Sequence, residues 1–390
     1  MKLKALLKTF SMPLALAGIW LFFIWKLDHD AIFGDGQGGF GRFVFLGPRN
    51  LTHLMVEFSI IGTLALGMFM ILLTGQIDLS VGSGAGLIGG IAAVLIFEHQ
   101  WGAAPALLTA FGVAMVLWTL MGTLIVTQRM PSFIITLGGL LIFKGLFWRV
   151  INNATVPVSR GDEENLYSRI TTYYLPANVG LLLIGVIVLV SGILLWRTRA
   201  ARAASGLTTG SVARPVAQFI GIAGVSYVIV SVCNHFHGLP ITLLILSCTA
   251  VTVYFLTKHT PFGRYLYAIG GNEEAAVLSG ISVNRVLVGA YVLMGAATAL
   301  TGFMTTAYQG SSSTTVGDLM ELDAIAACVI GGTALKGGRG TVWGVLFGTL
   351  IMTSLLNGMT LMAVEPHNKF MARGFVLALA VWLDIRLSRP

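Results

Sequence analysis

Residues 54–90 read LMVEFSIIGTLALGMFMILLTGQIDLSVGSGAGLIGG, and this stretch decides the class of fold. Its first part, 54–74, is an almost uninterrupted apolar run, long enough to cross a bilayer as a helix. Its second part, 75–90, has Asp78 near the head of a segment of small residues and glycines. We expect this second part to be broken or re-entrant, since irregular backbone at membrane depth is tolerated only inside protein or beside a wet cavity.

The composition of the whole chain also indicates that lipid is its solvent. The 390 residues are 56% hydrophobic and only 10% charged, with a mean hydropathy of +0.85, whereas soluble domains carry about 25% charged residues. The net charge of +8 is carried at the ends of apolar runs, so it does not indicate nucleic-acid binding. The cysteines are expected to be packing residues, with no disulfide framework and no metal site. They are Cys233, Cys248 and Cys328.

Apolar runs recur along the chain and predict an all-α polytopic membrane protein with about ten to twelve transmembrane helices, in a single domain over 1–390. No small-residue cleavage site follows the apolar residues 13–25, so the first run is expected to be a membrane helix. Two runs, 80–97 and 322–336, are short and Gly-rich, and each is a candidate for a broken or re-entrant segment. The runs are 10–27, 54–74, 80–97, 104–127, 132–150, 178–196, 215–233, 239–257, 286–308, 322–336, 341–362 and 370–386.

Lys and Arg residues are shared unevenly between the two sides of the membrane when these runs alternate from a cytoplasmic N-terminus. The side with both termini and residues 258–285 carries more of them, in keeping with the positive-inside rule. Both termini and the 258–285 loop are therefore expected in the cytoplasm. Residues 28–50 and 151–177 are expected as long outer loops, the second being either a landing surface for a soluble partner or a solvated face. Its charged residues are Arg160, Asp162, Glu163, Glu164 and Arg169.

The cytoplasmic loop contains a polar stretch, 264–283, which reads RYLYAIGGNEEAAVLSGISV. It predicts a short amphipathic helix over 273–278, closed by Gly280, which permits a turn at the helix end. The chain is strongly apolar, so the simplest interpretation of a short helix exposed to water is that it docks another protein. The expected docking residues are Asn272, Glu273, Glu274, Ala275, Ala276 and Gly280.

A weak echo of residues 75–90 occurs at 321–332, which reads ELDAIAACVIGG. Paired Gly-interrupted segments of this kind are typical of transporters built from two related halves, and chance similarity is the alternative. The acidic residue of each segment either caps a helix at the membrane edge or lines a cavity. The nearby hydroxyl groups either line a path for a hydroxylated cargo or only pack helices together. The candidate path residues are Asp78, Ser80, Ser83, Asp323 and Thr333.

The sequence contains no Walker-type ATP-binding loop. Residues 332–338, GTALKGG, resemble its start, but Gly338 stands where lysine is required and no strand precedes the loop. No nucleophile-and-base constellation is present, and His235 with His237 is expected to be a loop feature rather than a metal site. The chain is therefore not expected to be an enzyme, or to need a cofactor or metal of its own.

Several of these motifs resemble one family of transport proteins. Glu274-Ala-Ala, followed after three residues by Gly280, resembles the EAA loop of permease subunits of ATP-binding cassette importers. Residues 75–90 and 321–338 are similar to the monosaccharide group of that family, the ribose, galactose and xylose permeases, with the closest likeness to the xylose branch. The likeness covers about residues 50–386. In one departure, no proline follows Gly280, which leaves the grip on a partner open.

The resemblance implies a permease subunit of the bacterial inner membrane, usually two copies per complex, that forms the path for a monosaccharide such as xylose. It implies cytoplasmic ATP-binding subunits that grip the loop around 272–280, bind ATP and hydrolyse it, and a periplasmic protein that delivers the sugar. The alternatives are an ion-coupled secondary sugar transporter and a membrane scaffold or intramembrane enzyme. Ionisable residues within the apolar runs are few, Lys144 and Glu57 being the candidates, whereas an ion relay usually needs more. The identity of the sugar is not indicated, since selectivity is expected to lie largely in the binding protein.

Overall fold

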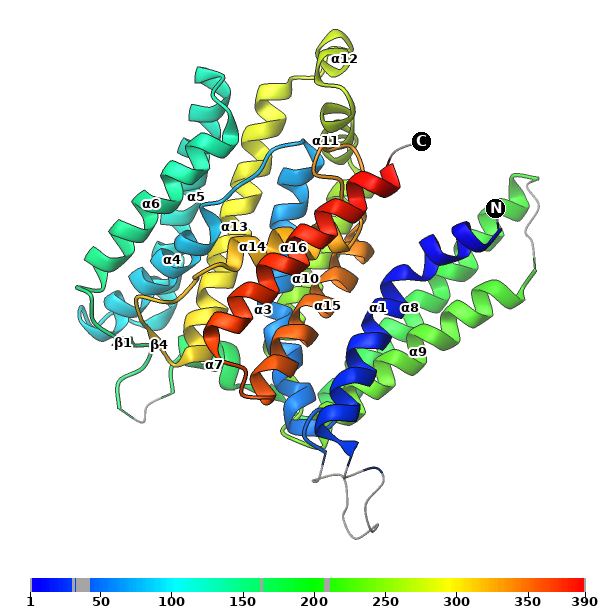
Figure 1. The fold of residues 1–390 in the computed structure, drawn as a ribbon, viewed down its shortest axis with the longest axis horizontal. Helices are drawn as coiled ribbons and strands as arrows, with labels where there is room; N and C mark the ends of the chain where they lie inside the picture. Colours follow the sequence, from blue (N-terminus) through cyan, green and yellow to red (C-terminus); the bar gives the residue numbers. More distant parts are fainter. Residues whose placement is uncertain (1, 30–31, 33–42, 162–163, 207–210, 389–390) are drawn as a thin grey trace.

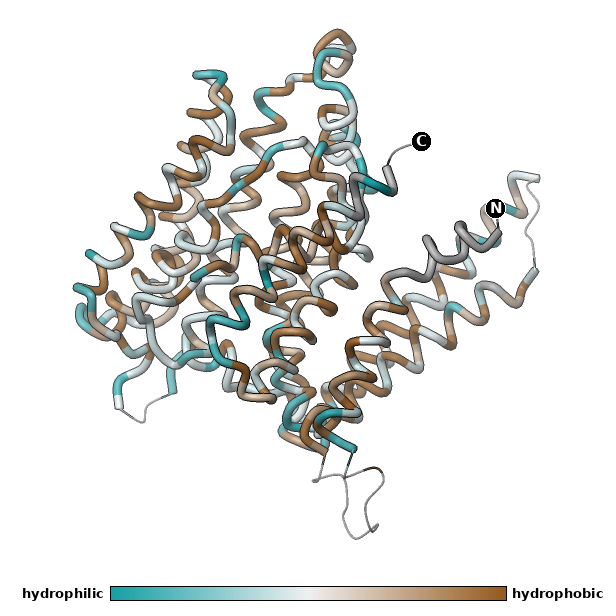
Figure 2. The backbone as a smooth tube through the Cα atoms, in the orientation of Figure 1, coloured by the Kyte–Doolittle hydropathy of each residue, from teal (hydrophilic) through white to brown (hydrophobic). Residues whose placement is uncertain are grey.

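The structure, a computed structural model, describes residues 2–29, 32, 43–161, 164–206 and 211–388, most of them helical (Figure 1). Among these residues, eight helices are long and apolar enough to cross a membrane, and two shorter apolar helices span 12–27 and 81–97. Hydrophobic residues predominate along the lengths of the helices and hydrophilic residues gather near their ends (Figure 2). The predicted all-α polytopic membrane fold is confirmed.

The helices and strands follow one another as α1 (Lys2–Leu27), α3 (Pro48–Leu73), α4 (Val81–Phe97), α5 (Ala103–Gln128), α6 (Ser132–Val150), β1 (Val156–Pro157), α7 (Leu166–Thr172), β2 (Tyr174–Leu175), α8 (Ala177–Ala204), α9 (Ala213–Asn234), β3 (Leu239–Pro240), α10 (Ile241–His259), α11 (Pro261–Gly271), α12 (Glu273–Leu278), α13 (Val283–Gln309), β4 (Ser311–Ser312), α14 (Met320–Ile330), α15 (Val342–Leu361) and α16 (Pro366–Ser388). The strands form two short antiparallel pairs, β1 with β4 and β2 with β3.

Local sequence explains several of the helix starts. Pro48 opens α3 and Pro261 opens α11, where a missing N–H costs nothing because the first turn leaves its donors unpaired. The Thr260 hydroxyl accepts a hydrogen bond from the Gly263 N–H in the first turn of α11. The Thr341 hydroxyl likewise accepts from the Gly344 N–H and caps α15.

Two sets of helices share the same order along the chain. The first is α3, a non-helical segment over 74–80, α4, α5 and α6, and the second is α13, a largely irregular segment over 310–319, α14, α15 and α16. The long helix of each set packs against the short helix of the other, α13 on α4 and α3 on α14, and α3 also packs against α13. The short helices are therefore held in the middle of the bundle, as Figure 1 shows for α14.

The two short segments are broken in different ways. Residues 81–97 form one continuous helix, α4, with the irregular backbone before it at 74–80. The predicted run 322–336 is helical only to Ile330, where Gly331 caps α14 and Gly332 takes a φ of +81°. The residues that follow, 333–341, are not helical. The Gly-Gly pair thus lies inside a helix in the first segment and ends the helix in the second.

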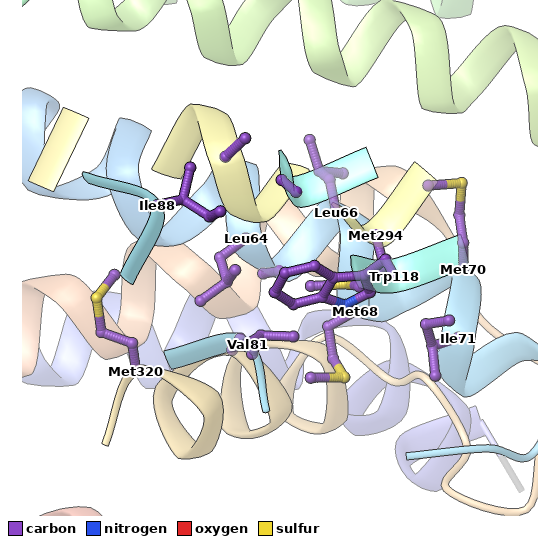
Figure 3. Close-up of a cluster of buried hydrophobic side chains, with 14 of the residues drawn as sticks. Leu64, Leu66, Met68, Met70, Ile71, Val81, Ile88, Trp118, Met294 and Met320 are labelled. Atoms are coloured by element: carbon purple, nitrogen blue, oxygen red, sulfur yellow. The ribbon is translucent and has the colours of Figure 1, made fainter. Parts of the chain in front are cut away.

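Trp118 of α5 is fully buried in the hydrophobic core. Figure 3 shows the Trp118 indole among Leu64, Leu66 and Met68 of α3 and Met294 of α13. Glycines on the facing helices make room for the ring, because a Cβ on Gly84 would lie only 2.2 Å from it. Small residues thus let the helices approach closely, which is the main source of packing in a membrane.

The predicted outer loop 151–177 contains regular structure, namely β1, α7 and β2. The Asn165 side chain and Ser168 form a reciprocal capping box at the start of α7. Tyr167 is fully buried, and its O–H donates to the Gly89 carbonyl of α4 at 2.9 Å. Arg169 and Glu164 remain exposed, whereas Asp162 and Glu163 lie outside the described residues. Most of the predicted loop 28–50 lies outside them as well.

Helices α1, α8 and α9 lie beside the main bundle (Figure 1). α9 packs against α3, and α1 packs against α15. The outward side chains of α8 are large and apolar, as at Leu182, which suits lipid contact.

Candidate functional site

A polar cavity of about 260 Å³ lies where α3, α13, α14, α15 and α16 meet. It is lined near the start of α3, the end of α13 and the 310–319 segment, at the end of the bundle opposite α11 and α12 (Figure 1). The hydroxyl groups of its lining come from Thr305, Tyr308, Thr315, Thr353 and Thr360. Among these lie apolar side chains such as Ile60 and Leu356. The cavity therefore offers many neutral hydrogen-bonding groups inside an apolar bundle.

An ion pair crosses the deep part of this cavity. Arg373 of α16 donates from Nη2 to Oδ2 of Asp323 on α14, at 3.2 Å, and the Asp323 side chain is almost fully buried. Two atoms of the same pair, Asp323 Oδ1 and Arg373 Nε, are buried without a hydrogen-bond partner. Buried polar atoms are nearly always satisfied by protein or water, so Asp323 Oδ1 can accept a further hydrogen bond and Arg373 Nε can donate one.

A second polar group occupies the wall formed by α3. Glu57 receives the Tyr308 O–H at Oε1 and the Asn357 amide at Oε2, each at 3.5 Å. The Asn357 Oδ1 atom is itself buried without a partner. A carboxylate inside a membrane bundle is costly and usually functional.

The rim of the cavity is tied to α6. The Lys144 ammonium contacts the Asp318 carboxylate and donates to the Thr314 carbonyl at 2.8 Å. It also lies over the Trp148 ring. Lys144, predicted to be one of the few charges within a span, is thus satisfied by the 310–319 segment.

Asp78, one of the candidate path residues, lies away from this cavity. It is fully buried, and Oδ1 accepts from both the N–H and the O–H of Ser80, at 2.9 and 2.6 Å. Oδ2 accepts from the Trp118 indole at 2.8 Å. Asp78 therefore joins the start of α4 to α5, with both oxygens satisfied.

The remaining candidates are spread over the molecule. Ser80 is buried beside Asp78, and Ser83 lies one turn into α4 with 7% of its surface exposed. Thr333 is fully buried, and its hydroxyl has no hydrogen-bond partner. It lies in the 331–341 segment, close to Gly340. Of the five candidates, only Asp323 lines the polar cavity.

The structure does bring the two Gly-rich segments together. A Cβ on Gly82 would lie 2.1 Å from a carboxylate oxygen of Glu321, so the heads of α4 and α14 touch. A second contact joins Gly75 to the 331–341 segment, since a Cβ there would lie 3.1 Å from the Lys336 carbonyl oxygen.

This second contact continues into the predicted docking loop. A Cβ on Gly270 of α11 would lie 1.9 Å from the Leu73 carbonyl oxygen and 2.5 Å from the Gly338 nitrogen. We call the meeting point of Gly75, Gly270, Gly337 and Gly338 the glycine junction. Nearby, the Tyr267 O–H donates to the Gly340 carbonyl at 3.0 Å, and burial raises the pKa of this phenol, which keeps it a donor.

The predicted short helix is present as α12, with the predicted bounds 273–278. The Asn272 side chain caps it by accepting from the Ala275 N–H at 2.9 Å. Glu273 and Glu274 are exposed in its first turn, where negative charges interact favourably with the helix dipole. Ala276 is buried.

The tip of α12 is apolar and unprotected. Leu278 is 89% exposed and Val277 is 55% exposed, at the end of the molecule where hydrophilic residues gather (Figure 2). Gly280 follows with a φ of +80° and open space around its Cβ position. A hollow of about 350 Å³ lies beside it, lined by Phe262, Tyr265 and Arg285 among others.

Sequence reasoning did not single out the cavity partners Tyr308 and Arg373, and it named Glu57 only as an ionisable residue within a span. Glu57, Tyr308, Asn357 and Arg373 come from four different helices, so no local motif joins them. The available signal was a charged residue inside an apolar run, which Glu57 and Arg373 both give. Among the described residues, no group of three or more His, Cys, Asp or Glu residues could hold a metal ion.

Comparison with known proteins defines the class of protein. Residues 50–381 match the family described as the permease component of the branched-chain amino acid transport system. The chain belongs to this family of membrane permeases. It is therefore a multi-pass membrane transport subunit.

The similar proteins include sugar permeases. The chain is 36% identical to the xylose transport system permease protein of Escherichia coli (strain K12), over 98% of this chain and 93% of that protein. It is also 36% identical to the xylose transport system permease protein of Haemophilus influenzae, over 98% of both chains. The ribose import permease protein of Bacillus subtilis is 34% identical over 88% of this chain and 87% of its own length. No solved structure matches.

Proposed function

We propose that this chain is the permease subunit of an ATP-binding cassette importer that carries xylose or a related pentose across the bacterial inner membrane. The observation that carries the proposal is the similarity, over almost the whole chain, to proteins named as xylose permeases. The family description names branched-chain amino acids. The hydroxyl-rich lining of the cavity favours a polyol instead, because each sugar hydroxyl needs both a donor and an acceptor.

The partners are assigned from the two ends of the bundle. Cytoplasmic ATP-binding subunits bind α12 through its exposed Leu278 and Val277 and its acidic first turn. In this proposal ATP is bound and hydrolysed by those subunits and not by this chain. A periplasmic sugar-binding protein docks at the opposite end, which holds α7 and the mouth of the cavity. A second copy of the permease completes the complex.

The orientation follows from the same arrangement. The described start of α1 and the described end of α16 lie toward the α11–α12 end of the molecule (Figure 1). In this proposal that end is cytoplasmic, and both termini are cytoplasmic with it. The excess of Lys and Arg on this side supports the assignment.

The path for the sugar runs through the polar cavity and past α14, with Asp323 as its deepest acidic group. Asp78 and Ser80 hold the start of α4 in place. Thr333 lies at the inner end of the route, where the 331–341 segment meets the docking loop. Ser83 lies on the α4 side, and its access to water decides whether α4 also borders the path.

Reconstitution tests the proposal directly. Vesicles with the permease, its ATP-binding subunit and its binding protein are expected to accumulate labelled xylose only when ATP is present. The permease alone is expected to hydrolyse no ATP and to give no saturable flux. Accumulation that needs no ATPase subunit would overturn the proposal.

An ion-coupled secondary transporter is the second candidate. It is favoured by one observation, the carboxylates of Glu57 and Asp323 in a cavity within the membrane. In the same vesicles, it predicts uptake by the lone permease that follows an imposed proton or sodium gradient and survives ATP depletion.

A further inference from the structure

The cavity beside α14 contains a buried ion pair with unused hydrogen-bonding capacity. Asp323 Oδ1 and Arg373 Nε are both buried without partners, although the two side chains bind each other through their other atoms. An ion pair that served only to join α14 to α16 would gain from satisfying these atoms, because a buried polar group without a hydrogen-bond partner destabilises the fold.

The neighbours of the pair define what could satisfy it. Thr305, Thr353 and Tyr308 line the same cavity and carry hydroxyl groups. Asn357 leaves its Oδ1 atom unpaired beside Glu57. This set combines charged and neutral acceptors with charged and neutral donors, and its members come from several helices.

Charge balance limits the class of ligand. Asp323 is already matched by Arg373, and Asp318 is matched by Lys144. An anionic ligand would have to break one of these pairs, whereas a neutral molecule with several hydroxyls can use the spare atoms as they stand. Such a molecule can also donate to Glu57, whose partners Tyr308 and Asn357 are neutral. The apolar Ile60 of α3 and Leu356 of α15, which also line the cavity, suit the C–H faces of such a molecule.

We propose that the cavity between α3, α13, α14, α15 and α16 is a transient binding subsite for a neutral polyol of pentose size, in which Asp323 and Arg373 hydrogen-bond to its hydroxyl groups. The subsite deepens the proposed function and rests on it. Binding is weak, since a transit site must release its cargo. In this proposal Asp323 and Arg373 contact the sugar inside the membrane, after the binding protein has delivered it.

Cysteine protection tests occupancy of the subsite. Thr360 lies on the exposed rim of the cavity, so a Thr360→Cys variant on a Cys248→Ser background reports access. The reaction of this cysteine with a small hydrophilic thiol reagent is expected to slow as the xylose concentration is raised. Osmotically matched sucrose is expected to leave the reaction rate unchanged. The control is Ser279→Cys in the same background. Ser279 is exposed and follows α12, and the labelling rate of this variant is expected to be independent of xylose.

Substitution of the ion pair tests its role. When it is added to the Thr360→Cys variant, Asp323→Asn is expected to abolish protection of the introduced thiol. It is also expected to lower ATP-driven xylose uptake about tenfold, the loss expected for one hydrogen bond to a charged group. The double variant Asp323→Asn with Arg373→Gln removes the unpaired arginine. If the pair only joins two helices, this neutral combination restores uptake, whereas a sugar subsite leaves uptake low.

The outcomes separate this inference from the proposed function. Uptake by the wild-type complex and thermal unfolding of each variant are measured on the same preparations. Suppose that the wild type shows ATP-driven uptake. The subsite is then overturned, and the function is retained, if xylose does not protect the Thr360→Cys variant or if the neutral double variant has full uptake. Loss of ATP dependence in the wild type overturns the function. The protection measurement needs only the Thr360→Cys variant, so it stands even if Asp323→Asn fails to fold.

Discussion

Asp78 and Asp323 lie in the heads of the two short segments of the bundle, but their surroundings differ. Asp78 accepts three hydrogen bonds, from Ser80 and Trp118, and both of its oxygens are used. Asp323 has one charged partner, Arg373, and keeps one oxygen unpaired beside a polar cavity. The first carboxylate is enclosed by its own structure, and the second is open to a ligand.

Two segments of similar sequence can therefore have different roles in one transporter. A fully satisfied buried carboxylate fixes one arrangement of the helices around it, because moving any partner leaves a buried polar group unpaired. A partly satisfied carboxylate can exchange hydrogen bonds with a passing molecule at little cost. We therefore assign the α4 segment to the scaffold and the α14 segment to transport.

The largest effect is expected at Asp78. Asp78→Ala leaves the Trp118 indole and the Ser80 groups without their acceptor in the core, which costs about 3 kcal/mol or more for several buried donors. Thermal unfolding in detergent is expected to shift strongly downward, with little folded protein in membranes. Ser80→Ala, which removes the hydroxyl donor and keeps the backbone N–H donor to the same oxygen, serves as the milder control. A fully stable Asp78→Ala protein would remove the distinction between the segments.

The glycine junction gives a sharper test with a matched pair of neighbours. A Cβ on Gly270 would overlap the Leu73 carbonyl and the Gly338 nitrogen, whereas a Cβ on Gly271 would meet nothing within 4 Å. Gly270→Ala is expected to cost about 1–3 kcal/mol of stability and to weaken the link between the docking loop and the 331–341 segment. Gly271→Ala is expected to behave as wild type in unfolding and in ATP-driven uptake. Equal behaviour of the two would mean that no close junction exists.

The tip of α12 is expected to affect coupling and not folding. Leu278 is 89% exposed, so Leu278→Ala removes almost no buried surface from the isolated permease. An apolar anchor of an interface is worth about 2 kcal/mol, so affinity for the ATP-binding subunit is expected to fall by more than tenfold. Leu182→Ala on α8, also exposed and apolar, is the control for a lipid-facing leucine. Undiminished binding after Leu278→Ala would place the docking surface elsewhere.

The smallest effect is expected at Gly280. Its φ of +80° is unfavourable for other residues, but its Cβ position is open, so Gly280→Ala is expected to cost only about 1 kcal/mol through backbone strain. Gly280→Asn is expected to cost less, because asparagine tolerates positive φ better than alanine. ATPase stimulation by the permease, measured for both variants, is expected to follow the same order. The opposite order would show that side-chain volume at the partner surface decides the effect.

Much of the fold could be predicted from the sequence because lipid imposes simple rules on length and polarity. The spans near 104–127 and 286–308 match α5 and α13 closely, whereas α3 begins at Pro48, before the predicted span 54–74. α12 has its predicted bounds because Asn272 and Gly280 are local signals. The ordered 151–177 region was missed, since Tyr167 is buried by distant α4.

The functional difference between the two acidic residues could not be predicted in this way. Asp78 and Asp323 each precede small residues and a Gly-Gly pair, so their sequence surroundings look alike. Trp118 lies 40 positions from Asp78, and Arg373 lies on the last helix. Only packing decides which carboxylate is enclosed and which faces a cavity.

The different roles of the α4 and α14 segments can be tested by measuring the access of water to each of them. Thr305 on the cavity wall and Ser83 on α4 are each 7% exposed, so Thr305→Cys and Ser83→Cys form a matched pair in a background without the native cysteines. Both are treated with a small hydrophilic thiol reagent in vesicles that contain the assembled transporter, with and without ATP. The Thr305→Cys variant is expected to react in at least one of these states, and the Ser83→Cys variant is expected to stay unmodified in both. Modification of the Ser83→Cys variant, with the Thr305→Cys variant unreactive, would contradict these roles and place the path along α4.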